Sequence, residues 1–403
     1  MKFKIRALNI KNREEGLKEY SKMGASPDGS NLMIDKIFPV SLKIRGVNPL
    51  AANILKQEML ARGGDVVTSW DTIKGNSKKT DVIVQGTNKG IENLIEKIST
   101  QPFGLKELSG NLKTYMDKME KKSKNNLLEI GTRKFNLDKK VIVMGVLNVT
   151  PDSFYDGGFY FEKEKAYKRV ENIVGEGADI IDVGGMSTRP GSKPVNPEEE
   201  MDRIIPVIQH VKKNYNILIS ADTSKPMVAE KAIEEGAHII NDVSGLSAGR
   251  DMADVIAKRD VSIIIMHIKG APENMQKNPQ YDNVIDEIYD FLEDKTAKAL
   301  ECGISPGKII IDPGIGFGKT LEHNLEILNK IKEFTMLGYP VMIGASRKSF
   351  IGSILDLPVD ERLEGSIAAA VYSIMNGVSI LRVHDVKETM RAIEVAGRIT
   401  GGF

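Results

Sequence analysis

The sequence predicts an α/β protein: a (β/α)8 barrel preceded by a small α+β domain. Three observations favour this fold. Eight short apolar runs rich in Val and Ile recur along the last two thirds of the chain, each run is continuous rather than alternating, and amphipathic stretches separate the runs. Continuous apolar runs are typical of parallel strands that are buried on both faces.

The eight runs are the predicted strands of the barrel. They cover residues 141–149, 179–183, 217–222, 238–243, 262–267, 309–313, 340–344 and 379–384. Helix patterns between them, such as 283–301 and 322–337, have lengths that suit crossover helices. An open doubly wound sheet is the alternative, but it usually has fewer strands and a G-x-G-x-x-G turn after the first one, which is missing here.

The chain before the first barrel strand divides into three parts. Residues 1–117 mix strand patterns (41–47, 81–87) with helix patterns (51–60, 91–98), which predicts a small α+β domain of unknown role. Residues 118–126 are a polar run, predicted as a linker, with a solvated helix end as the alternative. The barrel domain is predicted at 127–403. Its first segment, 127–137, is expected to form a β-hairpin, with Gly131 and Thr132 at the turn, that closes one mouth of the barrel.

Composition excludes several classes of function. The chain has 403 residues, and 56 Lys and Arg against 55 Asp and Glu leave a net charge of +1, which provides no field to attract nucleic acid or an anionic membrane. The single cysteine, Cys302, cannot form an internal disulfide. No apolar stretch approaches the roughly 20 residues of a membrane span, and the N-terminus lacks the apolar core of a signal peptide. We therefore expect a cytoplasmic protein.

Polar residues end every predicted strand. They are Asn148, Asp182, Asp222, Asn241 with Asp242, His267, Asp312, the segment 346–349, and Arg382 with His384. In this kind of barrel the carboxyl ends of the strands form the active site, so these side chains should converge on one mouth. A single Asp at a strand end most often caps the next helix, and that interpretation stays open for Asp222 and Asp242. A whole mouth of buried polar groups, however, is costly without a ligand.

The chemistry of these side chains predicts a ligand with two different ends. Donors and acceptors for a nitrogen-rich heterocycle come from Asp222, Asn241 and Asp312. Positive charge and donors for a phosphate or diphosphate come from Arg189, Arg382 and His384.

Three loop segments narrow the prediction further. The segment S-T-R-P-G (187–191) favours a mobile anion-binding lid, with an ordinary Pro-Gly turn as the alternative. The segment D-P-G-I-G-F-G-K (312–319) is rich in glycine but lacks the G-K-[ST] spacing of a P-loop, which excludes a nucleoside triphosphate site of that kind. His267 has no second His or Cys at zinc-ligand spacing, so positioning or packing is favoured over a zinc site.

Taken in order, the segments from about Leu127 to the C-terminus resemble the dihydropteroate synthases. The matching motifs are G-V-L-N-V-T-P-D-S-F-Y-D-G-G, G-A-D-I-I-D-V-G-G-M-S-T-R-P-G, I-S-A-D-T-S-K-P, I-I-N-D-V-S-G, M-H-I-K-G-A-P-E-N-M-Q, I-D-P-G-I-G-F-G-K, G-A-S-R-K-S-F-I-G and L-R-V-H-D-V. The resemblance implies a TIM barrel enzyme of folate biosynthesis. It would condense 6-hydroxymethyl-7,8-dihydropterin diphosphate with p-aminobenzoate and release diphosphate. The N-terminal residues lie outside the family's minimal pattern, although some bacterial and archaeal members carry similar extensions.

The resemblance also implies a role for each matching residue. The pterin would be held by Asp222, Asn241, Asp312 and Lys348. The diphosphate would be bound by Arg189, Arg382 and His384, with Arg382 also able to stack on the pterin and Asn148 ligating Mg²⁺. The p-aminobenzoate pocket would be formed by Thr188, Pro190, Phe317, Lys348 and Ser349. The lid over the site would include Asp152, Ser153, Phe154 and Asp156.

Two residues depart from the family's pattern. Met186 stands where Glu is usual, and Lys269 stands where Gln is usual. Both changes favour a more anionic ligand, such as the ribosylated aminobenzene phosphate that serves as acceptor in methanopterin synthesis. That acceptor is therefore kept as an alternative to p-aminobenzoate.

Two further classes of function are weighed against the synthase. A corrinoid-linked methyltransferase that binds a methylated pterin would explain the heterocycle residues but not the motifs S-T-R-P-G, S-R-K-S and R-V-H. A non-catalytic pterin-binding or scaffold protein is disfavoured by the presence of Asn148, Arg189, Lys348 and His384. The sequence also leaves a homodimer open, because residues 368–375 form an apolar face rich in small residues.

Overall fold

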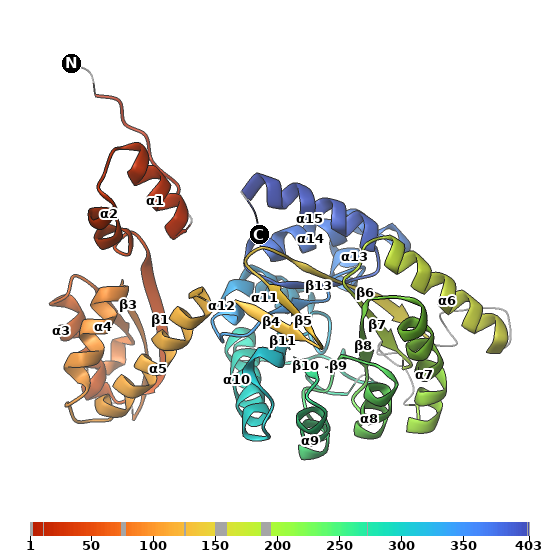
Figure 1. Cartoon of the computed structure of the whole chain (residues 1–403). Helices are drawn as coiled ribbons and strands as arrows, with labels where there is room; N and C mark the ends of the chain where they lie inside the picture. The colour runs from red at the N-terminus through yellow and green to blue at the C-terminus, as the bar shows by residue number, and fades with distance from the viewer. Residues whose placement is uncertain are drawn as a thin grey trace. The chain divides into compact units, whose positions relative to one another are not determined.

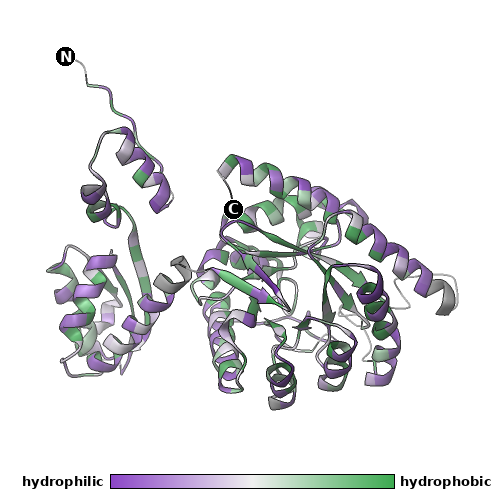
Figure 2. Cartoon of the chain, in the orientation of Figure 1, coloured by the Kyte–Doolittle hydropathy of each residue, from purple (hydrophilic) through white to green (hydrophobic). Residues whose placement is uncertain are grey.

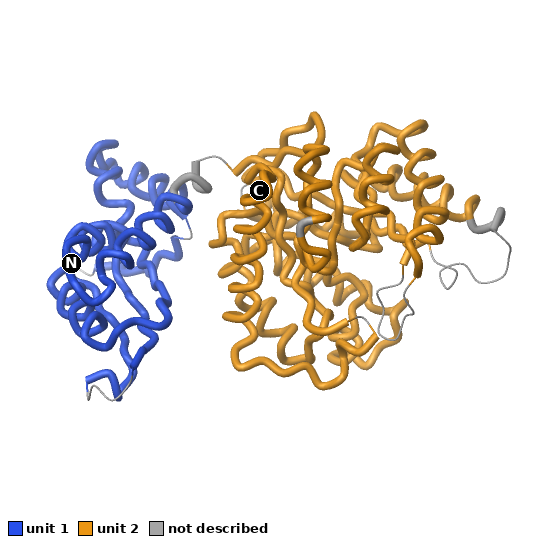
Figure 3. Tube along the Cα trace, turned by 90° about the horizontal axis from the view of Figure 1, so that it is seen from below, with its two compact units in different colours: residues 1–121 blue, residues 122–403 orange. Residues whose placement is uncertain are grey.

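The computed structural model describes residues 3–10, 12–73, 78–124, 126–149, 159–186, 195–271, 273–400 and 402. The chain divides into two compact units, residues 1–121 and residues 122–403 (Figure 3). Each unit has its own hydrophobic core. Within the described ranges, no helix is long and apolar enough to cross a membrane.

Eight parallel strands in the second unit form the predicted barrel (Figure 1). They are β6 (Ile142–Asn148), β7 (Ile180–Gly184), β8 (Leu218–Asp222), β9 (Ile239–Asp242), β10 (Ser262–Met266), β11 (Ile309–Asp312), β12 (Met342–Ile343) and β13 (Ile380–Val383). Their order is β11-β10-β9-β8-β7-β6-β13-β12, and a bridge between Ile311 and Val341 joins the two ends of the sheet. All eight predicted strands are confirmed, although β12 is only two residues long.

Helices surround the strands and bury the outer face of the barrel. They are α6 (Phe159–Gly175), α7 (Pro197–Asn214), α8 (Pro226–Glu235), α9 (Arg250–Arg259), α10 (Val284–Glu301), α11 (Leu321–Asn329), α12 (Ile331–Thr335), α13 (Ser349–Leu355), α14 (Leu363–Met375) and α15 (Val386–Thr400). Figure 2 shows apolar strands inside helices that carry hydrophilic residues on their outer faces. The pattern at 322–337, predicted as one helix, is divided at Lys330 into α11 and α12.

A hairpin closes the N-terminal mouth of the barrel, as predicted. It consists of β4 (Leu127–Ile130) and β5 (Arg133–Asn136). Leu128, Ile130 and Leu137 form one hydrophobic cluster with the first inward-facing residue of the barrel strands. Since this mouth is filled by apolar side chains, any ligand must enter at the opposite, carboxyl end of the strands.

The first unit is the predicted small α+β domain. Its elements are α1 (Arg13–Lys22), α2 (Pro27–Ile34), β1 (Pro39–Val47), α3 (Pro49–Leu60), β2 (Asp65–Thr68), β3 (Thr80–Thr87), α4 (Asn88–Ile98) and α5 (Leu105–Lys124). The strands form an antiparallel sheet in the order β1-β3-β2, and α3, α4 and α5 contribute to its core. Helix α5 continues through residues 118–124, so most of the stretch predicted as a linker is helical, while the division between the two units falls within it, after residue 121.

Candidate active site

The strand pleat directs polar side chains into the carboxyl half of the barrel. Successive residues of a strand point to opposite faces. In each strand, one apolar residue packs against the hairpin, and the residue two positions later also faces inward. On β7 this residue is Asp182, which follows Ile180, and on β9 it is Asn241, which follows Ile239. The same spacing brings Asp312 on β11 and Arg382 on β13 into the interior.

Arg382 spans the barrel and pairs with two carboxylates on other strands. Its Nε lies 2.6 Å from Asp182 Oδ2, and its Nη2 lies 2.8 Å from Asp222 Oδ2. Asn241 donates a hydrogen bond to the same oxygen of Asp182, at 3.2 Å. Burial raises the pKa of the Asp222 carboxyl, while Arg382 opposes that shift. Two nitrogen atoms of Arg382 are thus used in holding the floor of the site.

Asp182 is a central site residue to which the sequence analysis assigned no role. Its side chain is completely buried, and it contacts both Arg382 and Asn241. The period-2 alternation from Ile180 to Asp182 would have identified it as facing inward. Its ion pair with Arg382, 200 positions away in the sequence, could not be read from that pattern.

A pocket opens above this floor. Its lining is Asn241, Val243, Met266, Asp312, Ile315, Phe317, Met342, Gly344, Lys348 and Arg382. Four of the residues predicted to bind ligand, Asn241, Asp312, Lys348 and Arg382, therefore meet in one apolar-walled pocket.

Several buried polar atoms of the floor have no hydrogen-bond partner among the described residues. They include Asp182 Oδ1, Ser220 Oγ and Asn241 Oδ1. Buried polar groups are normally paired, because leaving one unpaired costs about 1–3 kcal/mol. Burial also raises the pKa of the Asp312 carboxyl to about 6. A ligand with ring nitrogens and an amino group would supply the missing partners for Asn241 and would hydrogen-bond with Asp312.

Lys348 and Phe317 form one wall of the cavity. The Lys348 Nζ lies 4.1 Å from the centroid of the Phe317 ring, a cation–π contact. Burial, together with the charge of Arg382, lowers the pKa of Lys348 to about 8. Ser349, the first residue of α13, is exposed, and no hydrogen bond fixes its side chain to another described residue.

His384 lies just beyond β13 and is oriented by Ser346. The Ser346 Oγ accepts a hydrogen bond from the His384 backbone N–H at 3.2 Å and lies 3.1 Å from Nδ1. The hydroxyl proton can therefore be donated to Nδ1, which leaves Nε2 as the N–H donor of the ring. Burial, with Arg382 and Arg347 nearby, lowers the pKa of His384 to about 4. With this lowered pKa, the ring is a hydrogen-bond donor through Nε2 at neutral pH.

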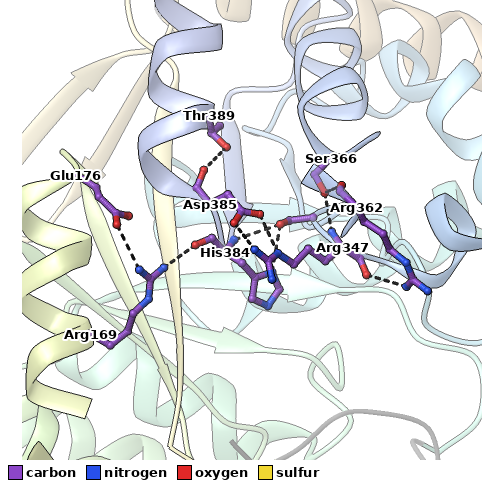
Figure 4. Close-up of polar contacts among 9 residues, drawn as sticks. Arg169, Glu176, Arg347, Arg362, Ser366, His384, Asp385 and Thr389 are labelled. Carbon is purple, nitrogen blue, oxygen red and sulfur yellow. Dashed lines mark hydrogen bonds and ion pairs between the residues drawn. The ribbon is translucent and has the colours of Figure 1, made fainter. Parts of the chain in front are cut away.

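A network of arginines fixes the backbone around His384 (Figure 4). Arg347 makes a two-point ion pair with Asp385, at 2.9 Å and 2.5 Å. Arg169 of α6 donates to the His384 carbonyl at 2.5 Å, and Arg362 donates to the carbonyl of Arg347 at 3.2 Å. Arg169 therefore connects α6, the helix that follows the predicted lid in the sequence, to the end of β13.

Asn148, the predicted metal ligand, ends β6 beside Gly184 and Asp222. A Cβ atom added at Gly184 would lie 3.6 Å from both Asn148 Oδ1 and Asp222 Oδ2, so the glycine leaves space between the two oxygens. Groups of three or more His, Cys, Asp or Glu residues that could hold a metal ion are not found among the described residues. Any Mg²⁺ at Asn148 would need most of its oxygen ligands from substrate and water, which suits this ion.

The remaining predicted residues fall into two groups. Asp152, Ser153, Phe154, Asp156, Thr188, Arg189 and Pro190 lie outside the described residues. The two departures from the family's pattern are described: Met186 is half-buried after β7, and Lys269 pairs with Glu287 at 2.8 Å and lies 4.0 Å from the Tyr281 ring centroid. Glu287 therefore lies within ion-pair distance of the charge that Lys269 adds.

Two polar strand ends serve the structure. Asp242 accepts hydrogen bonds from the backbone N–H groups of Ser244 and Leu246, so it fixes the turn after β9 rather than capping α9, whose N-cap is Gly249. His267 is buried and packs edge-on against Phe291, with ring centroids 4.9 Å apart. This agrees with packing rather than a zinc site.

Comparison with known proteins identifies the barrel. Residues 144–384 match the family described as pterin binding enzyme. The dihydropteroate synthase of Clostridium beijerinckii is 45% identical over 269 residues, which cover 66% of this chain and 97% of that protein. The crystal structure of FolP (dihydropteroate synthase) from Clostridium difficile, determined in the presence of pteroic acid, is 44% identical with a TM-score of 0.63, covering 66% of this chain and 98% of that one.

A longer match reaches beyond the barrel. The probable bifunctional folylpolyglutamate synthase/dihydropteroate synthase of Haloferax volcanii is 34% identical over 352 residues, which cover 86% of this chain and 41% of that protein. This span is longer than residues 122–403, so it includes part of the N-terminal unit. The family match, the close relatives and the convergence of their motifs on one cavity lead to one conclusion: the chain belongs to the pterin binding enzyme family, among the dihydropteroate synthases.

Proposed function

We propose that this protein condenses 6-hydroxymethyl-7,8-dihydropterin diphosphate with p-aminobenzoate to give 7,8-dihydropteroate and diphosphate. The observation that carries this proposal is the cavity in which Asn241, Asp312, Lys348 and Arg382 meet. The relatives that share its motifs are dihydropteroate synthases. Their name is that of enzymes that make dihydropteroate, and we assign the formation of dihydropteroate to this chain as well.

The cavity floor suits the pterin ring. Asn241 Oδ1 has no hydrogen-bond partner in the described part of the chain, and Asp312, which lines the cavity, is 3% exposed. A pterin has ring N–H and amino donors in one plane, so it can satisfy both acceptors at once. The apolar side chains of Val243, Met266 and Met342 then enclose the faces of the ring.

The wall formed by Phe317 and Lys348 suits the aryl amine. An aromatic ring can pack against Phe317, and the Lys348 ammonium can pair with a carboxylate. Ser349, Thr188 and Pro190 are proposed to complete this pocket. No general base is required, because the weakly basic amine needs mainly to be positioned and protected from water.

The leaving group needs stabilisation of negative charge. His384 offers its Nε2–H as a donor, and Arg189 is proposed as a second contact. Asn148 is proposed as the protein ligand of Mg²⁺, which when bound neutralises charge on the diphosphate.

The charge distribution favours departure of diphosphate before the amine attacks. Breaking the C–O bond leaves positive charge on the pterin methylene, and the buried carboxylates Asp222 and Asp312 lie on the ring side of the site. We therefore expect an SN1-like transfer with little bonding to nitrogen in the transition state. A nitrogen isotope effect large enough to require strong amine participation would contradict this order.

The acceptor is tested by direct comparison. Initial rates would be measured with p-aminobenzoate and with a ribosylated aminobenzene phosphate, each with Mg²⁺ and after its removal by a chelator. The pairing of Lys269 with Glu287 supports p-aminobenzoate as the preferred acceptor. Preference for the phosphorylated acceptor would reverse the assignment, and methyl transfer to a corrinoid without diphosphate chemistry would support the methyltransferase alternative.

Assembly and location stay as proposals from the sequence. The surface of α14 and α15 carries exposed apolar side chains, including Met375, Val395 and Ile399, which is consistent with the expected homodimer. Sedimentation at several concentrations, with Ile399→Glu as the disrupting variant, would test it. The cytoplasmic location remains a prediction.

A further inference from the structure

Lys319 is a buried lysine that the proposed reaction does not use. It ends the glycine-rich segment 312–319, and its side chain is only 3% exposed. Among the described residues, no carboxylate lies within ion-pair distance of its ammonium group. Burying an ammonium group costs free energy unless its N–H groups make hydrogen bonds, so the hydrogen bonds of Lys319 keep this residue in the folded protein.

The Lys319 ammonium joins two loops that border the cavity. Its Nζ donates to the Phe317 carbonyl at 2.9 Å and lies 3.0 Å from His267 Nδ1, with the His267 carbonyl farther away at 3.5 Å. Burial lowers the pKa of His267 to about 2, so its ring is neutral and Nδ1 can accept. Lys319 therefore ties the loop after β11 to the end of β10.

Two other side chains complete this anchoring. Gln276 Nε2 donates to the Gly316 carbonyl at 2.5 Å, and the Tyr281 hydroxyl donates to the Gly318 carbonyl at 2.8 Å. Three successive carbonyls, those of residues 316 to 318, are thus each held by a different side chain. Glycines 314, 316 and 318 all have positive φ, so this segment is neither helix nor strand. Its backbone carbonyls therefore need hydrogen-bond donors from elsewhere in the chain.

The anchored segment carries a wall of the reaction site. Phe317 lines the cavity and is 7% exposed, and its ring lies 4.1 Å from Lys348 Nζ. A shift of the Phe317 backbone would move its ring and remove the surface against which Lys348 rests. Two of the proposed pterin contacts, Asn241 and Asp312, lie instead on the strands β9 and β11.

We propose that Lys319 is a positioning residue for the acceptor: by holding the Phe317 carbonyl against His267, it fixes the wall on which p-aminobenzoate rests. This inference depends on the proposed function for its substrate, but the anchoring itself does not. Burial lowers the pKa of Lys319 to about 7. A neutral amine still has two hydrogen atoms for its two short contacts, so the anchoring persists when the proton is lost.

The test compares Lys319→Met and Tyr281→Phe with a matched control, Lys308→Met. Lys308 is also a mostly buried lysine that donates to a backbone carbonyl, that of Asp260 at 2.5 Å, but it lies before β11, at the opposite end of the barrel. Lys319→Met should raise KM for p-aminobenzoate about tenfold, because one hydrogen bond that positions Phe317 is lost. The same variant should change KM for the pterin diphosphate by less than about twofold. Tyr281→Phe should shift the same constant by less, and Lys308→Met should shift neither.

Two results would overturn the inference. One is an unchanged KM for p-aminobenzoate in Lys319→Met, and the other is an equal rise of both KM values, as general destabilisation would produce. If Lys319→Met does not fold, Tyr281→Phe carries the comparison. If the unmodified protein makes no dihydropteroate, the proposed function fails, and the anchoring is then measured by deuterium exchange. The backbone amides of residues 314–319 should exchange faster in the two loop variants than in Lys308→Met, and equal rates would refute the anchoring.

Discussion

At the scale of single residues, the site depends on Arg382 and its two carboxylate partners. Arg382→Met would leave Asp182 and Asp222 buried without their counter-charge, which typically costs about 3–5 kcal/mol. We predict a corresponding loss in the free energy of unfolding, measured by urea denaturation. Adding Asp182→Asn and Asp222→Asn to the same variant should restore much of the loss. Unaltered stability of Arg382→Met would show that the ion pairs contribute nothing.

The lowered pKa of Lys348 predicts that activity falls on the alkaline side of the pH profile. With its pKa lowered to about 8, Lys348 is charged below that pH and loses its proton as the pH rises through it. Since kcat/KM reports the free enzyme, kcat/KM should fall above about pH 8. The carboxylate of bound p-aminobenzoate favours the ammonium, so the fall in kcat should occur at higher pH. Initial rates over a pH series check this, and a kcat/KM that stays flat well beyond pH 9 would contradict the assignment.

Much of the site could be predicted at this scale, because strand-end residues are visible in the sequence. Asn241, Asp312, Lys348 and Arg382 do line one cavity. What the sequence could not supply was pairing across the barrel: Arg382 bonds with Asp182, and this contact follows from closure of the sheet. The neutrality of His384 likewise results from burial and from neighbouring charges that meet only in the folded chain.

At the scale of elements, the glycine-rich loop after β11 determines the shape of the acceptor wall. A Cβ atom at Gly314 would overlap the His267 carbonyl oxygen, and the residue has φ +71°. Gly314→Ala should therefore destabilise the protein by roughly 1–3 kcal/mol and raise KM for p-aminobenzoate. Gly307→Ala is the control, since nothing lies within 4 Å of its added Cβ. Thermal unfolding and kinetics of both variants check the prediction, and identical behaviour would contradict it.

Strands were more predictable than helices and loops because each barrel strand is buried on both faces. Continuous apolar runs such as Ile309–Asp312 leave little ambiguity. The edge strand β2 has alternating burial and only four residues, and it was not predicted. The division between α11 and α12 also escaped prediction, because the amphipathic pattern continues across Lys330.

At the scale of the whole molecule, the barrel and the N-terminal unit have separate cores. The structural match with the Clostridium difficile enzyme covers 98% of that enzyme but only 66% of this chain. A comparable barrel therefore exists without the extension. We predict that residues 127–403 fold alone and keep kcat/KM within about twofold of the full chain. Circular dichroism and initial rates would check this. A fragment that folds but has lost activity would assign the N-terminal unit a part in catalysis.

The most direct test of the central claim is diphosphate release by the full-length protein. The purified protein would receive 6-hydroxymethyl-7,8-dihydropterin diphosphate and Mg²⁺, with or without p-aminobenzoate, and diphosphate and dihydropteroate would be measured together. Release that requires p-aminobenzoate and matches dihydropteroate one to one is the predicted result. Release at the same rate without p-aminobenzoate, or pterin binding with no release at all, would contradict the assignment.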